Sequence, residues 1–445
     1  VTLKRNIYIL NVTLKRNMEI RKLNEWNPWW EDAKLVEKLM GKERQSYESL
    51  INSIKIREIT IITGVRRSGK STLMYQMIHN LIKNKVNPKH ILFVNLEDKK
   101  LKDDTLDDIY LSYRENLNQN EKSYIFLDEV HRKEGWEHWI RKKYDLKTND
   151  KFIISGSSSY LLKKEYSTLL TGRNLTFEVF PLSFEEFLSF KNLMINKDNL
   201  NKGILLEQSL ILIKRYLKEY INFGGFPEVF FKDEDYKVRV LEQYFDDILY
   251  KDIIDRYNLN TQKAKDLALF LINNFTGQIS LRNLRSSIKL SYDTIKDYLF
   301  HFKEASLFFL LNHFSYSFKT QQTIAPKVYC IDNGLRNAVS FKFSSDEGKL
   351  VENLVYIELV RRRSNIFYWK KKNEVDFVIK NKNNLLTAIN VSYTDDIPER
   401  EIKALFEFKG EHKNKTKELI IINKSLEKKE NGIMFIPLWK WLLSE

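Results

Sequence analysis

Short apolar runs alternate with longer amphipathic stretches through the first part of the chain. The apolar runs are rich in β-branched and aromatic residues, as buried strands are, and they lie at 57–63, 91–94, 124–127, 152–154 and 175–180. The stretches between them have helical spacing. Because parallel strands need crossover helices, this alternation predicts an α/β fold with a parallel sheet covered by helices on both faces.

The pattern changes on either side of these strands. Residues 18–55 are predicted to be helical, with a tryptophan-rich opening at Asn27-Pro28-Trp29-Trp30. The segment 183–257 is again helical, with one break at Gly224-Gly225-Phe226-Pro227. Short helices and then a hairpin are predicted over 262–315, and the remainder mixes strand and helix.

The N-terminus carries a short repeat, because 1–6 recurs at 12–17. The repeat is too short for a solenoid unit, and it lacks the apolar core and cleavage site of a signal peptide. Met18 follows directly. We therefore interpret 1–17 as a mis-assigned or disordered extension outside the fold.

The segment after the first strand has the residues of a phosphate-binding loop. It fits G-x-x-x-x-G-K-[ST] in full, with Gly64-Val65-Arg66-Arg67-Ser68-Gly69-Lys70-Ser71 between a predicted strand and a predicted helix that continues through Thr72. Gly64 allows a sharp turn, and Gly69 lets the backbone approach phosphates closely. The amides of the loop and of the helix N-terminus form a cradle for anionic oxygens. Lys70 is expected to reach the β and γ phosphates of ATP, and the Ser71 hydroxyl to ligate Mg²⁺.

Two acids follow the strand at 124–127. Asp128 and Glu129 emerge at its carboxyl end, where ligands bind in open α/β sheets. We expect Asp128 to hold the Mg²⁺ shell, and Glu129 to orient the attacking water and accept its proton.

Two further positions extend the site, each with an open alternative. Ser155 or Ser157 follows the strand at 152–154 and would sense the γ-phosphate, unless this run is only a serine-rich turn. Arg173 would supply positive charge to the γ-phosphate, from the same chain or from a neighbour, unless it is a surface arginine. Such an arginine contributes about 10³–10⁵ in rate.

Taken together, these residues resemble the AAA+-type prokaryotic ATPases that are often archaeal. The similarity rests on the phosphate-binding loop with Arg66-Arg67 and on Leu127-Asp128-Glu129, Ser155-Gly156-Ser157, Gly172-Arg173, 181–187, 224–228 and 247–253. It covers nearly the whole chain after residue 20. The resemblance implies an additional-strand P-loop sheet and a C-terminal domain of unknown function.

Residues 278–311 are similar to a winged helix. Ser291 suits the N-cap of the second helix, and Ile295, Tyr298, Leu299 and Phe302 have the spacing of a core face. Such a helix enters a DNA major groove in some proteins. Its outward face is mixed rather than strongly basic, so packing or protein contact is the equal alternative.

The C-terminal region resembles restriction-endonuclease-like folds. Glu352, Glu374 and Asp376 are its candidate acids. Nucleases of that type use an acid on one strand and E-x-K on the next to hold Mg²⁺. Here the next strand carries Asn390 and Ser392 at those places, so an inactive nuclease-like domain is predicted.

Six segments are expected on this basis. They are 1–17 (extension), 18–55 (helical), 56–190 (P-loop ATPase), 191–260 (helical and lid-like), 261–318 (winged-helix-like) and 319–445 (restriction-endonuclease-like).

The amino-acid composition indicates the cellular compartment and the kind of partner. The only cysteine is Cys330, and no apolar run approaches the ~20 residues of a membrane span, so a cytoplasmic protein with no membrane partner is predicted. The net charge of +15 favours an anionic partner such as DNA, although a lysine-rich proteome explains it equally well. A protein partner and a homo-oligomer stay open. His131 and His138 share the spacing of one helix face, which alone is no metal site.

The leading hypothesis is an ATPase whose Mg²⁺-dependent hydrolysis moves the attached helical, winged-helix-like and C-terminal parts. The alternatives are a slow nucleotide-dependent regulatory switch and an ATP-coupled nuclease.

Overall fold

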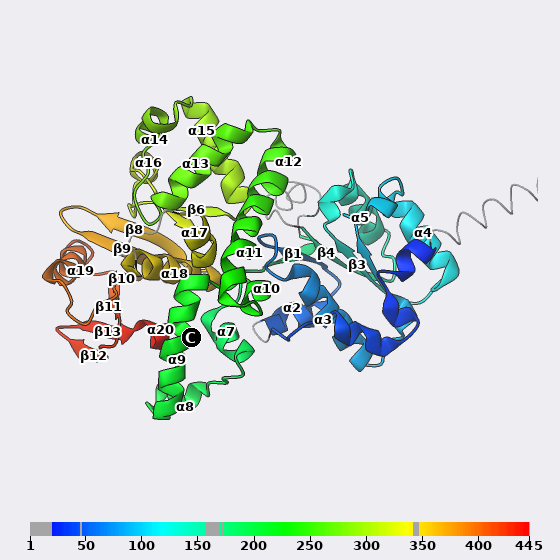
Figure 1. The fold of residues 1–445 in the computed structure, drawn as a ribbon, viewed down its shortest axis with the longest axis horizontal. Helices are drawn as coiled ribbons and strands as arrows, with labels where there is room; N and C mark the ends of the chain where they lie inside the picture. The colour runs from blue at the N-terminus through cyan, green and yellow to red at the C-terminus, as the bar shows by residue number, and fades with distance from the viewer. Residues whose placement is uncertain (1–19, 45–46, 157–169, 171, 341–346, 445) are drawn as a thin grey trace, which may run out of the picture. The chain divides into compact units, whose positions relative to one another are not determined.

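The computed structural model describes residues 20–44, 47–156, 170, 172–340 and 347–444. The proposed extension 1–17, Ser157 and Thr171 therefore lie outside the described residues. The chain divides into two compact units, Val1–Val179 and Phe180–Glu445 (Figure 1).

The first unit is built on a parallel sheet of five strands. These are β1 (Ile59–Thr63), β2 (Ile91–Asn95), β3 (Ser123–Asp128), β4 (Asp150–Ser155) and β5 (Asn174–Glu178). Their order is β2-β3-β4-β1-β5, and every pair is parallel. β4 lies between β1 and β3 as the additional strand, so the predicted fold class is confirmed.

Helices cover both faces of this sheet, because alternate strand residues point to opposite sides. Ile59 and Ile61 of β1 join one core, and Ile62 joins the other. The first core includes residues of α4 (Leu106–Asn116) and α5 (Trp136–Asp145), and the second includes residues of α3 (Lys70–Lys83). The remaining short helices are η1 (Pro28–Trp30), η2 (Ala33–Lys38), α2 (Glu48–Asn52), η4 (Ser53–Lys55), η5 (Pro88–His90), η6 (Lys99–Leu101) and η7 (Val130–Arg132).

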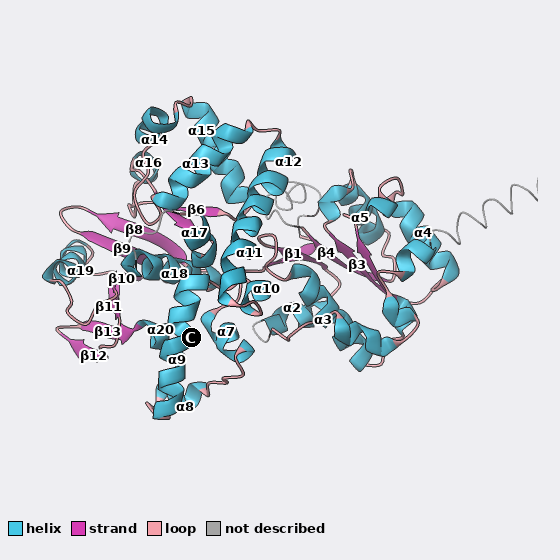
Figure 2. Cartoon of the chain, viewed as in Figure 1, coloured by secondary structure: helices cyan, strands magenta, loops and turns pink. Residues whose placement is uncertain are grey.

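The second unit begins with a series of helices, and its strands come later in the chain. Figure 2 shows these helices and strands by type. The helices are α7 (Phe184–Phe190), α8 (Lys197–Asn201), α9 (Glu207–Phe223), α10 (Pro227–Phe230), α11 (Glu234–Asp247), the π-helix η8 (Ile248–Ile254), α12 (Asp255–Tyr257), α13 (Thr261–Asn273), α14 (Leu281–Ile288) and α15 (Tyr292–Glu304). The helical prediction for 183–257 is confirmed, whereas the π-helix was not foreseen.

The break at Gly224 has a structural cause. Gly224 has a φ of 70°, and a Cβ there would lie 1.9 Å from Asp332 Oδ1. The next amide, of Gly225, donates to Asp332 Oδ2 at 2.7 Å. Glycine therefore ends α9 and admits a buried carboxylate, which no larger residue would allow.

A hairpin and a six-stranded sheet complete the second unit. β6 (Phe308–Leu311) pairs antiparallel with β7 (Lys327–Cys330), so the hairpin spans the boundary expected at 318. The sheet has the order β12-β13-β11-β10-β9-β8 and mixes parallel with antiparallel pairs. Its strands are β8 (Asn365–Lys370), β9 (Glu374–Lys380), β10 (Leu386–Ser392), β11 (Thr416–Asn423), β12 (Lys428–Glu430) and β13 (Ile433–Pro437). The helices of this part are α16 (Phe318–Thr323), α17 (Asn333–Val339), α18 (Glu347–Arg361), α19 (Glu399–Glu411) and α20 (Leu438–Leu443).

No helix in the described part of the chain is both long enough and apolar enough to cross a membrane.

Candidate active site

The loop between β1 and α3 needs glycine at two points. Gly64 has a φ of 139°, and a Cβ there would lie 2.1 Å from the carbonyl oxygen of Val179. Gly69 has a φ of 97° directly before α3 begins at Lys70. Side chains disfavour this backbone region, so the two glycines let the chain turn closely around the N-terminus of α3. A cradle of this kind suits anionic oxygens.

The lysine of the loop is held by the loop itself. Lys70 Nζ donates to the carbonyl oxygens of Gly64 and Val65, at 3.1 Å each. The side chain is buried. The ammonium is thus placed inside the turn, where the phosphates of a bound nucleotide would take over its hydrogen bonds.

The ends of β3 and β4 converge with the first turn of α3 beside this loop. Ser71 Oγ, in the first turn of α3, donates to Asp128 Oδ2 at 2.6 Å. Ser155 Oγ, at the end of β4, donates to Asp128 Oδ1 and accepts a 3.1 Å hydrogen bond from the backbone N–H of Glu129. Hydroxyl and carboxylate oxygens are ligands that Mg²⁺ prefers, so Ser71 and Asp128 fit a magnesium nucleotide. The structure brings together Lys70, Ser71, Asp128 and Ser155 as expected from the sequence.

Glu129 is a strained and buried acid. Its φ of 54° lies in the left-handed region, which costs about 1–3 kcal/mol for a residue with a side chain. Only 8% of Glu129 is exposed, and Oε2 makes no hydrogen bond within the described structure. Burial raises the pKa of Glu129 to about 7, against the opposing charge of Lys70 and with support from Asp128. A carboxyl group with such a pKa is suited to accept a proton near neutral pH.

His131 lies next to that acid. Its Nδ1 is 3.4 Å from Glu129 Oε2. No role for His131 was predicted from the sequence, since its spacing with His138 suggested only a shared helix face. Its position two residues after Glu129 could have indicated that the two side chains lie close together.

Glu97 connects two arginines near the site. Glu97 follows β2, and its Oε1 accepts from Arg66 at 3.1 Å and from Arg132 at 2.5 Å. Burial alone would raise the pKa of Glu97, but Arg66 and then Arg132 lower it to about 2. Sequence reasoning missed Glu97 and Arg132, although each closely follows the carboxyl end of a strand. The side chain of Arg66, expected at the phosphates, is bound to this carboxylate.

The N-terminal segment supports the loop from behind. Arg44 donates to the carbonyl oxygen of Ser68 at 2.8 Å, and only 4% of Arg44 is exposed. Gln76 of α3 donates to the carbonyl oxygens of Met40 and Lys42, at 2.9 Å each. The helical prediction for 18–55 did not indicate this role.

Arg173 lies apart from these residues. Its carbonyl oxygen accepts from Ile59 N–H at the amino end of β1, and its Nε donates to Asp145 at 2.9 Å. The P-loop follows the opposite, carboxyl end of β1. With five residues at ~3.3 Å each, the strand separates Arg173 from the P-loop of its own chain by roughly 15 Å.

The C-terminal acids surround a lysine. Lys327 Nζ lies 3.0 Å from Glu352, 2.6 Å from Glu374 and 3.2 Å from Asp376, and only 3% of Lys327 is exposed. Burial disfavours the ammonium, yet these acids raise the pKa of Lys327 above its ordinary value. Burial raises the pKa of Glu352 to about 7, although Lys327 opposes that rise.

On the next strand, Asn390 and Ser392 stand as the sequence indicated. Asn390 Oδ1 accepts from Asp376 N–H at 3.2 Å, and Asn390 Nδ2 donates to Glu401 at 2.7 Å. The lysine of an E-x-K motif was expected on the strand after Asp376, whereas Lys327 lies earlier in the chain, on β7. Lys327 was not predicted, because no local sequence pattern indicates that it pairs with these acids. Within the described residues no group of three or more His, Cys, Asp or Glu is arranged to hold a metal ion.

The winged-helix-like segment has its expected helices. Ser291 accepts from Thr294 N–H at 3.1 Å as the N-cap of α15. The predicted core face of α15 is buried, namely Ile295, Tyr298, Leu299 and Phe302. Tyr292 and Lys296 are exposed, as predicted.

Three family models match successive parts of the chain. Residues 56–188 match a family described as AAA domain. Residues 214–346 and 347–441 match two families described only as domains of unknown function, DUF8612 and DUF4143. These matches place the P-loop and its acids in an AAA-type ATPase domain.

Relatives match over nearly the full length. The uncharacterized protein MJ1544 of Methanocaldococcus jannaschii is 37% identical over 407 residues, which are 87% of this chain and 88% of that protein. An uncharacterized protein of Haemophilus influenzae is 32% identical over 414 residues, 90% of this chain and 98% of that protein. A solved chain of the S. cerevisiae Hsp104–ADP complex aligns at 16% identity, over 62% of this chain and 40% of that chain, with a TM-score of 0.33.

Proposed function

We propose that this chain, which belongs to the same family as MJ1544 of Methanocaldococcus jannaschii and the Haemophilus influenzae protein and contains an AAA domain, binds ATP with Mg²⁺ and hydrolyses the bond between the β and γ phosphates. One observation carries the proposal. Ser71, Asp128 and the buried acid Glu129 meet beside a backbone cradle that contains Lys70. A structural role alone would not require an acid with a strained backbone and an unsatisfied oxygen at that place.

Each residue then has a chemical task. Ser71 and Asp128 would hold Mg²⁺, which would offset the negative charge of the phosphates. Lys70 leaves the carbonyl oxygens of Gly64 and Val65 and binds phosphate oxygens. Glu129 accepts a proton from the attacking water as the water oxygen bonds to the γ-phosphorus. The bond from phosphorus to the β–γ bridging oxygen breaks, so ADP and inorganic phosphate leave.

Two substitutions test this assignment. Lys70→Ala is expected to abolish Mg²⁺-dependent ATP binding in equilibrium titration. Glu129→Gln is expected to retain binding and to lose turnover by at least a hundredfold, the scale of a general base. Wild-type turnover in Glu129→Gln would show that another group accepts the proton.

A slow switch is the second candidate function. Arg173 is bound to Asp145 at the far edge of the sheet, and the arginines near the site, Arg66 and Arg132, are bound to Glu97. An isolated chain would then hydrolyse ATP slowly and retain the nucleotide, until a neighbour or a partner supplies an arginine. Rapid ATP turnover by the dilute, partner-free chain, with fast release of ADP, would contradict the switch.

Nucleotide state is proposed to act through the second unit on DNA or on a protein. The helices α14 and α15 with the hairpin β6–β7 form its winged-helix-like part. The C-terminal sheet is proposed to be an inactive nuclease-like domain, since Lys327 lies among the acids where a nuclease would hold Mg²⁺. Mg²⁺-dependent DNA cleavage that is lost in Asp376→Ala would overturn this.

A further inference from the structure

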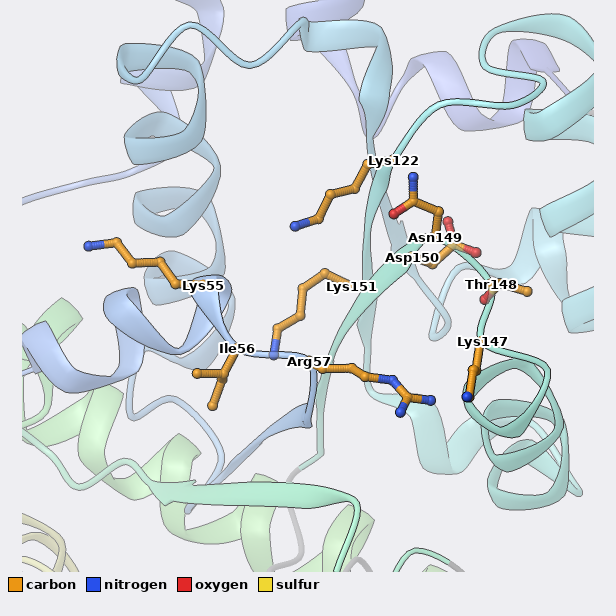
Figure 3. Close-up of a pocket in the computed structure, with 9 residues that line it drawn as sticks. All are labelled: Lys55, Ile56, Arg57, Lys122, Lys147, Thr148, Asn149, Asp150 and Lys151. Carbon is orange, nitrogen blue, oxygen red and sulfur yellow. The ribbon is translucent and has the colours of Figure 1, made fainter.

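The amino edge of the ATPase sheet carries a second, strongly basic pocket. Its volume is about 540 Å³, and it is open to solvent. It is lined by the segments that lead into β1, β3 and β4, namely Lys55, Ile56, Arg57, Lys122, Lys147, Thr148, Asn149, Asp150 and Lys151 (Figure 3). Since all strands are parallel, this edge is opposite the P-loop.

Positive charge dominates the pocket. Five of its lining residues are basic, and Lys55, Arg57, Lys122 and Lys147 are exposed. The one acid, Asp150, is already engaged by Arg114 and by Tyr110 OH at 2.8 Å. It therefore leaves most of the positive charge of the pocket uncompensated.

A buried ammonium group adds to this charge. Only 2% of Lys151 is exposed, and its Nζ donates to the carbonyl oxygen of Glu58. Lys122, which directly precedes β3, and Lys151 of the neighbouring strand β4 extend the same way (Figure 3). Burial lowers the pKa of Lys151 to about 7, with support from the charge of Lys122 and against the opposing charge of Glu58. A bound anion in the pocket would therefore favour the charged form of Lys151.

The side chains that line the pocket indicate which kind of anion it binds. No aromatic residue is among the lining residues, so the pocket offers no ring on which a base would stack. Flexible lysines and the polar side chains of Thr148 and Asn149 suit phosphate oxygens without reading sequence. We propose that this pocket binds phosphate groups of a nucleic-acid backbone, without base specificity. This goes beyond the proposed hydrolysis, because binding here does not need the P-loop.

The test compares two triple charge reversals in the full chain. The first, Lys55→Glu with Lys122→Glu and Lys147→Glu, reverses exposed pocket residues. The matched control, Lys34→Glu with Lys38→Glu and Lys102→Glu, makes the same change in net charge on exposed lysines elsewhere in the unit. Binding of a labelled 20-nucleotide single strand is followed by fluorescence anisotropy over a salt series.

The wild type and the control are expected to bind. The pocket variant should lose at least tenfold in affinity at low salt, and its salt slope should fall by about 2, near 0.7 for each lost phosphate contact. Equal weakening of both variants, or no binding by the wild type, would overturn the proposal. Displacement of the strand by inorganic pyrophosphate at micromolar concentration would assign the pocket to a small phosphate ligand instead.

Two controls separate this proposal from that of ATP hydrolysis. The pocket variant should bind ATP as the wild type does, which also shows that it is folded. Lys70→Ala should bind the oligonucleotide normally. A wild-type protein that binds the oligonucleotide but not ATP would refute only the nucleotide site, and one that binds ATP but not the oligonucleotide would refute only the pocket.

Discussion

At the scale of single residues, the charge on buried acids determines both chemistry and stability. Glu129 and Glu352 each have a pKa raised to about 7 by burial, yet their surroundings differ. Glu129 has an oxygen with no hydrogen bond, whereas Glu352 binds Lys327 and Tyr329. Glu129 is therefore available for a reaction, whereas the charge of Glu352 is neutralised within the fold.

Glu129 should lower the stability of the unliganded protein at high pH. Its pKa rises from 4.5 in the unfolded chain to about 7 in the folded one, so the folded state binds the proton more tightly. The free energy of unfolding therefore falls by roughly 3 kcal/mol as the pH rises from 4.5 through 7. Urea unfolding should show Glu129→Gln more stable than wild type by up to that amount at pH 8, and little different at pH 4.5. The exposed Glu134→Gln should show no such pH-dependent gain. A constant difference across this pH range would contradict the assignment.

Lys327 should be essential to the fold of the second unit. Replacing it in Lys327→Met leaves three acids without their shared positive charge, at a cost of about 3–5 kcal/mol. Thermal unfolding should show a smaller loss at pH 5 than at pH 8, because Glu352 can then take up a proton. Lys371→Met breaks an exposed ion pair with Glu411 and should cost at most about 1 kcal/mol. Equal thermal stability of the Lys327→Met and Lys371→Met variants would show that Lys327 is not essential to the fold.

At the scale of elements, the active site depends on a segment that contributes no catalytic residue. The indoles of Trp29 and Trp30 donate to the carbonyl oxygen of Ile91 at 3.3 and 2.8 Å, which fastens η1 to β2. Arg44 then reaches the back of the P-loop. The sequence indicated helix for this segment, and the structure gives it only short helices because side-chain contacts with the sheet determine its path.

Arg44→Met should weaken ATP binding more than it weakens the fold. The change leaves the buried carbonyl of Ser68 without this donor, at about 1–3 kcal/mol, and loosens the loop that must hold phosphates. Titration with ATP below the unfolding temperature should show a several-fold higher Kd. The exposed Arg21→Met, in the same segment, should leave the Kd unchanged. An unaltered Kd in Arg44→Met would show that the loop keeps its shape without this support.

At the scale of the whole molecule, the position of Arg173 decides which chain's γ-phosphate this arginine can reach. Within one chain Arg173 lies roughly a strand length from the P-loop. If Arg173 serves the reaction, it must serve the site of another copy. A role for Arg173 in catalysis would therefore require a homo-oligomer.

Turnover per chain should then rise with protein concentration. Arg173→Ala should abolish that rise while leaving ATP binding intact. Arg141 bonds the same Asp145, at 3.4 Å, so Arg141→Ala is the matched control and should keep the rise. Concentration-independent turnover in the wild type would exclude this role for Arg173.

The sequence by itself determined the local features of this protein. β-branched runs specified the strands to within a few residues, and the two glycines with Lys70 and Ser71 specified the P-loop, because each depends on neighbouring residues and backbone preferences. It also indicated the acids at the end of β3 and the absence of an E-x-K pair on β10.

Only the tertiary structure decided which distant side chains meet. Strand order and register bring Ser155 to Asp128, Glu97 to Arg66 and Lys327 to Glu352, and they separate Arg173 from the P-loop. No local pattern encodes these pairings, since they depend on how far-apart segments are placed in a sheet. The same placement gathers Lys55, Lys122, Lys147 and Lys151 at one edge, although nothing in their spacing joins them.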